Sequence, residues 1–115
     1  MEPKTAQGCV LIVEDPLIRR FVGGILKREG RSVVEAEPDQ ALRILRAGEC
    51  AVSLLITNQP EHFLEFAATL PLLYIAAFPD AALAVCFPHY RMLRKPFYPP
   101  DLLRCAAELL RVPAV

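Results

Sequence analysis

Strand-like and helix-like segments alternate five times along this chain, and that alternation limits the fold more than any other feature. Short apolar runs predict strands at residues 9–13, 32–36, 52–57, 72–77 and 90–93. Segments with apolar residues at helical spacing follow them, at residues 17–30, 38–48, 61–69, 79–87 and 101–111. This order favours one α/β domain over residues 1–115, with a core of about 8–111, in which a five-stranded parallel sheet lies between two helical layers. The segment 61–69 permits only about two turns, so the third helix is expected to be short.

Composition excludes several classes of function. Thirteen basic and thirteen acidic residues leave no net charge, so the chain lacks the basic footprint of a nucleic-acid or membrane-surface binder. The first eight residues lack the pattern of a signal peptide, and no apolar run reaches the roughly 18 residues of a membrane span. We expect a cytoplasmic protein whose partners are neither nucleic acids nor membranes.

The four cysteines show no spacing typical of a metal site. Cys9, Cys86 and Cys105 lie in apolar stretches, which indicates buried thiols in a reducing compartment. A redox role for one pair of the four remains an alternative.

Polar groups follow several of the predicted strands. In a doubly wound parallel sheet, ligands bind outside the carboxyl ends of the strands. The residues that the predicted strands deliver to this edge are Glu14, Asp15, Asn58, Ala76, Ala77 and Lys95. We therefore expect any functional site of this chain to lie there.

Four motifs in this order carry a family resemblance: "VLIVEDPLIRR", "LLIT" before position 58, "LLYIAAFPD" and "LRKPF". With them the chain resembles the receiver domain of bacterial two-component response regulators, similar to the chemotaxis regulators, from about residue 8 to residue 111. The resemblance implies a flavodoxin-like receiver fold. In that family an aspartate after the third strand accepts a phosphoryl group from a histidine kinase, an acid pair holds Mg²⁺ and a lysine meets the phosphoryl oxygens. A Ser or Thr after the fourth strand then moves an aromatic residue on the fifth.

The match is complete for the acids and the lysine and fails elsewhere. Glu14 and Asp15 correspond to the acid pair, and Lys95 with Pro96 to the lysine motif. Asn58 stands at the acceptor position, where a neutral amide cannot form an acyl phosphate or supply the carboxylate that Mg²⁺ prefers. The two switch positions are degenerate as well, because Ala76 has no hydroxyl and Met92 no aromatic ring.

These departures predict a degenerate receiver that keeps the scaffold and has lost the phosphoryl switch. The loop after Asp15 is one residue shorter than usual in the family, and the loop after Asn58 about two. Without a charge at position 58, Lys95 is expected to pair with Glu14 or Asp15 in a structural salt bridge. The two acids are weak candidates for Mg²⁺, and the alternative for them is a solvated or helix-capping role. No other cofactor is expected.

The predicted function is a stand-alone binding module of two-component signalling, a pseudo-receiver without enzymatic activity and without an output domain. Its expected partner is a signalling protein such as a histidine kinase or another regulator, or a second copy of the chain in a homodimer. Two alternatives stay open. One is a conventional phosphorelay receiver that uses Mg²⁺ and an unusual acceptor such as Asp15, and the other is a small hydrolase.

The first predicted helix holds two unusual features. Leu17, Phe21, Ile25 and Leu26 lie near one helical face, which we expect to be the buried one. Gly23 and Gly24 fall mid-helix, where each costs about 0.5 to 1 kcal/mol relative to Ala. Either another helix approaches closely there, as in a dimer, or the helix packs against its own core.

Overall fold

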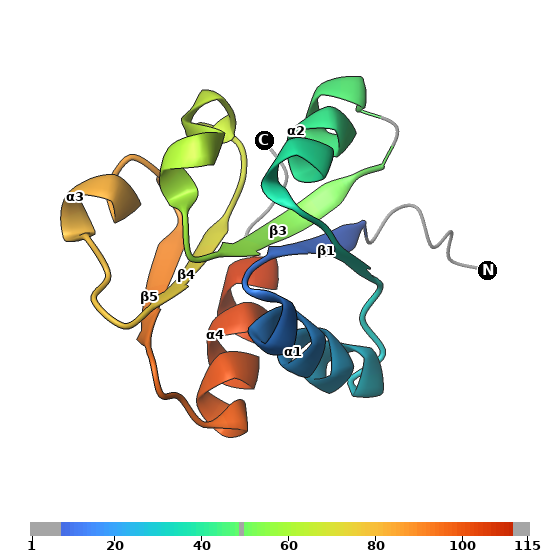
Figure 1. The fold of residues 1–115 in the computed structure, drawn as a ribbon, viewed down its shortest axis with the longest axis vertical. Helices are drawn as coiled ribbons and strands as arrows, with labels where there is room; N and C mark the ends of the chain where they lie inside the picture. The colour runs from blue at the N-terminus through green and yellow to red at the C-terminus, as the bar shows by residue number, and fades with distance from the viewer. Residues whose placement is uncertain (1–7, 49, 112–115) are drawn as a thin grey trace.

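The computed structural model describes residues 8–48 and 50–111 of the chain. Five strands form one parallel sheet in the order β2-β1-β3-β4-β5 (Figure 1). Every predicted strand end lies within one residue of the observed end. In chain order the elements are β1 (Cys9–Val13), α1 (Pro16–Arg28), β2 (Val33–Glu35), α2 (Pro38–Ala47), β3 (Val52–Thr57), η2 (Pro60–Phe66), β4 (Leu72–Ala76), α3 (Ala81–Ala84), β5 (Tyr90–Arg94) and α4 (Pro99–Leu110).

Helices cover both faces of the sheet, as the alternation of elements predicts. Residues of α1 and α4 pack on one face, and residues of α2, η2 and α3 pack on the other (Figure 1). Strand β1 and residues 54–56 of β3 are continuous apolar runs, because their successive side chains point into the two cores in turn. Among the described helices, none combines the length and the apolar character that a bilayer crossing requires.

The third and fourth helical segments are shorter and more irregular than predicted. The expected helix at 61–69 is a 3-10 helix with a non-helical backbone at Phe63, whose ring is fully buried. The expected helix from Pro79 to Phe87 is a single α-turn, α3. Asp80 starts that turn by accepting a hydrogen bond from the Ala82 N–H at 2.9 Å, and the buried Phe87 lies beyond its end. In each segment a fully buried phenylalanine lies where the helix is interrupted or has already ended.

The buried face of α1 differs from the predicted one. Ile25 and Leu26 are buried as expected, together with Val22, but the Leu17 side chain is 81% exposed and Phe21 is also exposed. The ring of Phe21 lies at the rim, 6.2 Å from the ring of Phe97. The first turn of α1 therefore extends past the edge of the core, which helical spacing alone does not reveal.

The cysteines are less uniformly buried than predicted. Cys9 and Cys105 are buried, but Cys86 is exposed and Cys50 is half-buried. The prediction was wrong for Cys86: an apolar stretch indicated a buried thiol, but Cys86 lies beyond the end of α3 and is exposed.

Candidate functional site

The predicted site residues do gather at one edge of the sheet. Glu14 follows β1, Asn58 follows β3, Ala76 ends β4 and Lys95 follows β5. These four strands are consecutive neighbours in the sheet and run parallel, so their carboxyl ends meet.

An ion pair between Glu14 and Lys95 occupies the centre of this edge. Lys95 Nζ lies 3.1 Å from Glu14 Oε1, although the two residues are 81 positions apart in the chain. The Glu14 side chain is 0% exposed and that of Lys95 is 22% exposed. The Lys95 backbone N–H also donates to the Ala76 carbonyl at 2.9 Å, which holds the lysine beside β4. Of the two expected partners of Lys95, the structure selects Glu14.

Burial dominates the electrostatics of Glu14. Desolvation raises the pKa of this carboxyl above its ordinary value, while the hydrogen bonds from Lys95 and from the Asp15 backbone N–H act to lower it. Oε1 accepts both of those hydrogen bonds. Oε2 is buried and has no hydrogen-bond partner among the residues that the structure describes. The carboxylate therefore depends on Lys95 for most of its stabilisation.

Asp15 and Asn58 lie closer to solvent. Asp15 is exposed and stands at the N-cap of α1, but within the described chain its carboxylate makes no capping hydrogen bond. Asp15 therefore fits the solvated alternative without a side-chain cap, whereas Glu14 is enclosed and is not a solvated acid. Asn58 is half-buried at the end of β3.

Two hydroxyl groups that the sequence analysis did not single out also shape this edge. The buried Thr57 hydroxyl accepts a hydrogen bond from the Gln59 N–H at 3.0 Å and closes a tight turn around Asn58. The Tyr74 hydroxyl accepts one from the Asp80 N–H at 3.1 Å and ties β4 to the start of α3. A polar group inside an otherwise apolar strand, as in "LLIT" and "LLYIA", is the signal that could have indicated both.

The two predicted switch positions, Ala76 and Met92, lie on adjacent strands. Ala76 is half-buried, and its carbonyl accepts the hydrogen bond from the Lys95 backbone N–H. Met92, on β5 opposite Tyr74, is exposed. Neither side chain carries a group that could hydrogen-bond to a phosphoryl oxygen.

Solved structures share this architecture. A response regulator receiver protein from Burkholderia phymatum is 23% identical, with a TM-score of 0.75 over 93% of this chain and 98% of its own. The chemotaxis response regulator CheY4 of Vibrio cholerae is 18% identical, with a TM-score of 0.71 over 89% of this chain and 98% of its own. The chain has the receiver fold. No protein-family model and no curated protein matches the sequence.

The receiver fold also occurs as part of a larger protein. NtrX from Brucella abortus is 25% identical, with a TM-score of 0.73 over 90% of this chain. The present chain spans 26% of that NtrX chain.

The residues at this edge fit Mg²⁺ poorly, although the receiver fold implies such a site. A hard divalent cation takes oxygen ligands, chiefly carboxylates. Here the Glu14 carboxylate is enclosed and faces the ammonium group of Lys95, which would repel a metal ion. Of the two acids that follow β1, Asp15 is then the one outside this ion pair. In the described part of the chain, no three His, Cys, Asp or Glu side chains are grouped to hold a metal.

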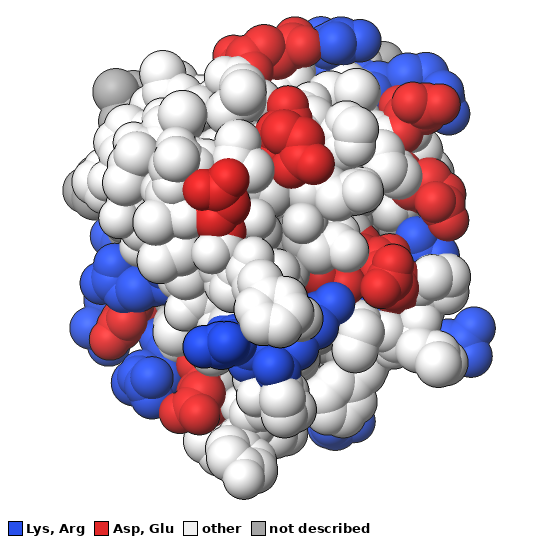
Figure 2. All heavy atoms as spheres, turned by 60° about the vertical axis from the view of Figure 1, so that its left-hand side comes forward, with Lys and Arg blue, Asp and Glu red and all other residues white. Residues whose placement is uncertain are grey.

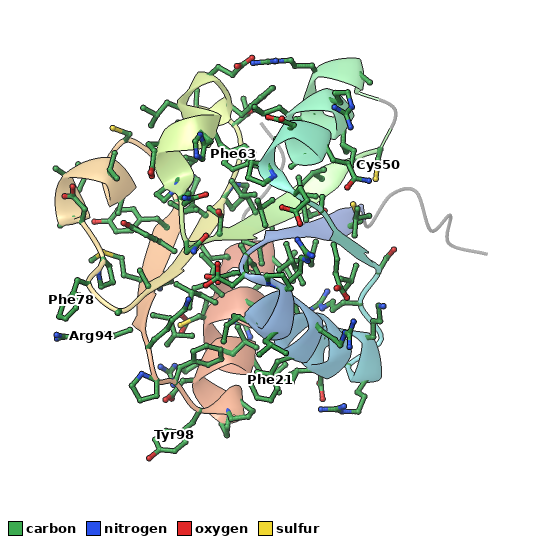
Figure 3. The ribbon with its side chains drawn as sticks, viewed as in Figure 1. Phe21, Cys50, Phe63, Phe78, Arg94 and Tyr98 are labelled. Atoms are coloured by element: carbon green, nitrogen blue, oxygen red, sulfur yellow. The ribbon has the colours of Figure 1, made fainter. Side chains whose placement is uncertain are left out.

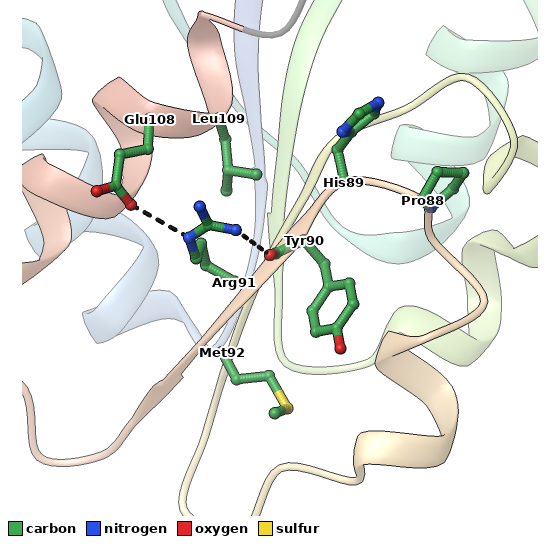
Figure 4. Close-up of a pocket in the computed structure, with 7 residues that line it drawn as sticks. All are labelled: Pro88, His89, Tyr90, Arg91, Met92, Glu108 and Leu109. Atoms are coloured by element: carbon green, nitrogen blue, oxygen red, sulfur yellow. Dashed lines mark hydrogen bonds and ion pairs between the residues drawn. The ribbon is translucent and has the colours of Figure 1, made fainter.

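A separate groove lies beside the start of β5 and the end of α4, away from Lys95 (Figure 4). It measures about 430 Å³, and Arg91 crosses it, donating to Glu108 Oε1 at 3.1 Å and to the Tyr90 carbonyl at 2.9 Å. None of the predicted site residues except Met92 lines this groove.

Proposed function

We propose that this protein is a degenerate receiver of two-component signalling that acts by binding another signalling protein, without phosphorylation. The observation that carries the proposal is the ion pair between Glu14 and Lys95. A working receiver needs the lysine free for phosphoryl oxygens and the acids free for a metal. In this chain Lys95 Nζ is already paired with Glu14 Oε1, and the Glu14 side chain is fully enclosed.

The neighbouring residues support the same function. Asn58 has no ionised oxygen to attack a phosphorus atom, and phosphoryl transfer requires both a nucleophile and cations that neutralise the transferred charge. Ala76 and Met92 offer neither a hydroxyl to follow a phosphoryl group nor an aromatic ring to relay a change. We expect no hydrolase activity either, and a panel of phosphate esters would test this.

Exposed apolar side chains supply a surface for contact with a partner. Between the end of β4 and the start of α4, four large apolar residues are exposed: Phe78, Val85, Met92 and Tyr98. Arg94 stacks over the ring of Phe78 at 5.5 Å, and both side chains extend from the same side of the molecule (Figure 3). Figure 2 turns this side forward and shows a mostly neutral surface with a band of basic side chains. Aromatic and arginine side chains often dominate binding energy at interfaces, which suits a histidine kinase or another regulator as the partner.

A conventional phosphorelay role is the second candidate, because Asp15 is an exposed carboxylate at the correct edge of the sheet. It requires Mg²⁺ and a labile phosphoryl group on Asp15.

An amide NMR titration distinguishes the two candidates. Mg²⁺ is added first, then beryllofluoride, a mimic of a bound phosphoryl group. We expect the resonances of Glu14, Asp15, Asn58 and Lys95 to stay unchanged. Joint shifts of these residues and of β5, abolished in the Asp15→Asn variant, would contradict the proposal of binding without phosphorylation. They would support the phosphorelay role instead.

The variant Asn58→Asp tests how much of the switch is lost. We expect that treatment with a small phosphoryl donor will leave its oligomeric state unchanged, because Lys95 remains paired with Glu14 and position 76 still lacks a hydroxyl. Size-exclusion chromatography with light scattering, with and without the donor, measures this. A donor-dependent change in oligomeric state would show that one substitution suffices to restore the switch.

A further inference from the structure

Two cysteines distant in sequence meet at the opposite edge of the sheet from the ion pair. The sulfur atoms of Cys9 and Cys50 lie 3.0 Å apart across a separation of 41 residues. Cys9 begins β1, and Cys50 lies just before β3, the strand next to it in the sheet. The Cys9 backbone N–H donates to the Ala51 carbonyl at 2.8 Å, so the backbone beside both thiols is already held together.

The two thiols differ in access. Cys9 is buried, and burial, together with the adjacent Cys50 thiol, raises the pKa of Cys9 to about 12. Cys50 is half-buried on the connection between α2 and β3 (Figure 3). It lines an open cavity of about 360 Å³ together with Gln40, Arg43, Ile44 and Ala47. Of the two thiols, a reagent in solution therefore reaches Cys50 first, through a cavity that Arg43 also lines.

We propose that Cys9 and Cys50 are a modification site that forms a reversible intramolecular disulfide by exchange with a small anionic peptide disulfide such as oxidised glutathione. The second thiol within contact distance, together with the cavity that Cys50 lines, favours formation of a disulfide at Cys50.

The exchange balances in two steps. The Cys50 thiolate, its proton released to water, attacks one sulfur of oxidised glutathione, and the S–S bond breaks to release one glutathione thiolate. Cys9 then loses its proton, and its sulfur attacks Cys50 Sγ in the mixed disulfide and displaces the second glutathione thiolate. The two cysteines are oxidised, and one glutathione disulfide is reduced to two thiols. Because its raised pKa keeps Cys9 protonated, this second step depends on the partner sulfur being already adjacent.

The geometry requires little rearrangement. A disulfide bond is about 2.05 Å long, so the sulfur atoms must approach by about 1 Å. The bond would link β1 to the segment before β3 and enclose α1, β2 and α2 in one covalent loop. Glu14 and Lys95, at the far ends of their strands, are outside its reach.

The test uses the full-length protein in buffers of oxidised and reduced glutathione. After equilibration, acid quenching and alkylation of remaining thiols, peptide mapping by mass spectrometry reports the state of each cysteine. We expect most of the Cys50 peptide to be recovered linked to the Cys9 peptide, lighter than the two thiols by two hydrogen atoms. Cys86, which is exposed, is the internal control and should carry glutathione as a mixed disulfide.

Three results would overturn the proposal: both cysteines remaining thiols while Cys86 reacts, Cys50 retaining glutathione beside a free Cys9, or Cys50 pairing with Cys86 instead. The Cys9→Ala variant sharpens the test, since in it Cys50 should stop at the mixed disulfide. The Cys86→Ser variant should form the same Cys9 to Cys50 link as the parent. Mapping of the unmodified chain decides the question even where the Cys9 variant folds poorly.

Discussion

At the scale of single residues, the ion pair between Glu14 and Lys95 is asymmetric. The Glu14 side chain is completely enclosed, whereas that of Lys95 still reaches solvent. Removing one partner of a buried pair leaves an uncompensated charge, which costs more than the pair contributes when it is intact. The two members should therefore respond differently to substitution.

Replacing Lys95 by methionine should destabilise the protein more than replacing Glu14 by glutamine. Lys95→Met leaves a buried carboxylate without its cation, and we expect a loss of about 2 to 3 kcal/mol in the free energy of unfolding near neutral pH. Glu14→Gln removes the buried charge and lets the lysine extend into water, so about 1 kcal/mol or less is expected. Urea denaturation of both variants measures the difference, and equal losses would contradict the asymmetry.

The pH dependence of stability follows from the raised pKa of Glu14. The ordinary pKa of this carboxyl is 4.5, and its pKa in the folded protein is higher. Between these two values the native protein binds more protons at Glu14 than the unfolded chain does. The contribution of Glu14 to stability must then fall as pH rises through this window, and it is constant below it. The free energy of unfolding, compared with Glu14→Gln at several values between about pH 4 and 8, isolates this effect. A contribution that increases with pH would show that Lys95 outweighs burial.

At the scale of elements, α1 shows why two adjacent glycines in a helix are not equivalent. A Cβ atom placed on Gly23 would lie 2.6 Å from Glu35 Oε2 on β2, whereas one on Gly24 would find its nearest neighbour, Arg28, at 3.9 Å. Gly23 thus permits a close approach of α1 to the sheet within the same chain. The close contact at Gly23 thus lies within the same chain, with the side chain of Glu35.

Gly24→Ala should stabilise the protein by about 0.5 to 1 kcal/mol, because alanine favours the helix and limits the unfolded chain. Gly23→Ala is the matched control. There the added methyl group brings the same gain in helix propensity but must displace the Glu35 carboxylate, which lies 3.8 Å from Lys27 Nζ. We therefore expect a smaller gain in stability or none. Thermal or urea unfolding of the two variants compares them directly, and an equal gain at both positions would refute the close contact with β2.

At the scale of the whole molecule, the receiver scaffold separates two edges of one sheet. The carboxyl ends of the strands hold the ion pair, and the amino ends hold Cys9 and Cys50. A ligand that binds only the folded state at either edge would raise the stability of the entire domain. Measurements of global unfolding can therefore detect ligand binding at either edge even where the binding causes no visible structural change.

Magnesium should leave global stability unchanged. At about 10 mM Mg²⁺, a site with a dissociation constant of about 1 mM would add roughly 1.4 kcal/mol to the free energy of unfolding. We expect no change within error, because Glu14 is committed to Lys95 and the remaining carboxylate is that of Asp15. Urea unfolding in MgCl₂ and in NaCl of equal ionic strength provides the measurement and its control. A magnesium-specific gain of that size would mean that Asp15 and Asn58 suffice as ligands.

The sequence by itself determined the order of the elements, the parallel sheet and the edge at which the candidate site lies. These depend on local patterns: apolar runs such as 9–13 and 52–57 are buried on both faces wherever they occur in an α/β domain, and the residues that follow them must meet at one edge. Site residues such as Glu14 and Lys95 could therefore be named from the chain alone.

Only the tertiary structure decided which of these groups touch. It paired Lys95 with Glu14 rather than Asp15, exposed Leu17, ended α3 after one turn and placed Cys50 against Cys9. Each outcome depends on strand register and helix packing between segments far apart in the chain. Periodicity in a window of one or two turns carries no information about such contacts, because their energies arise only once the layers are assembled.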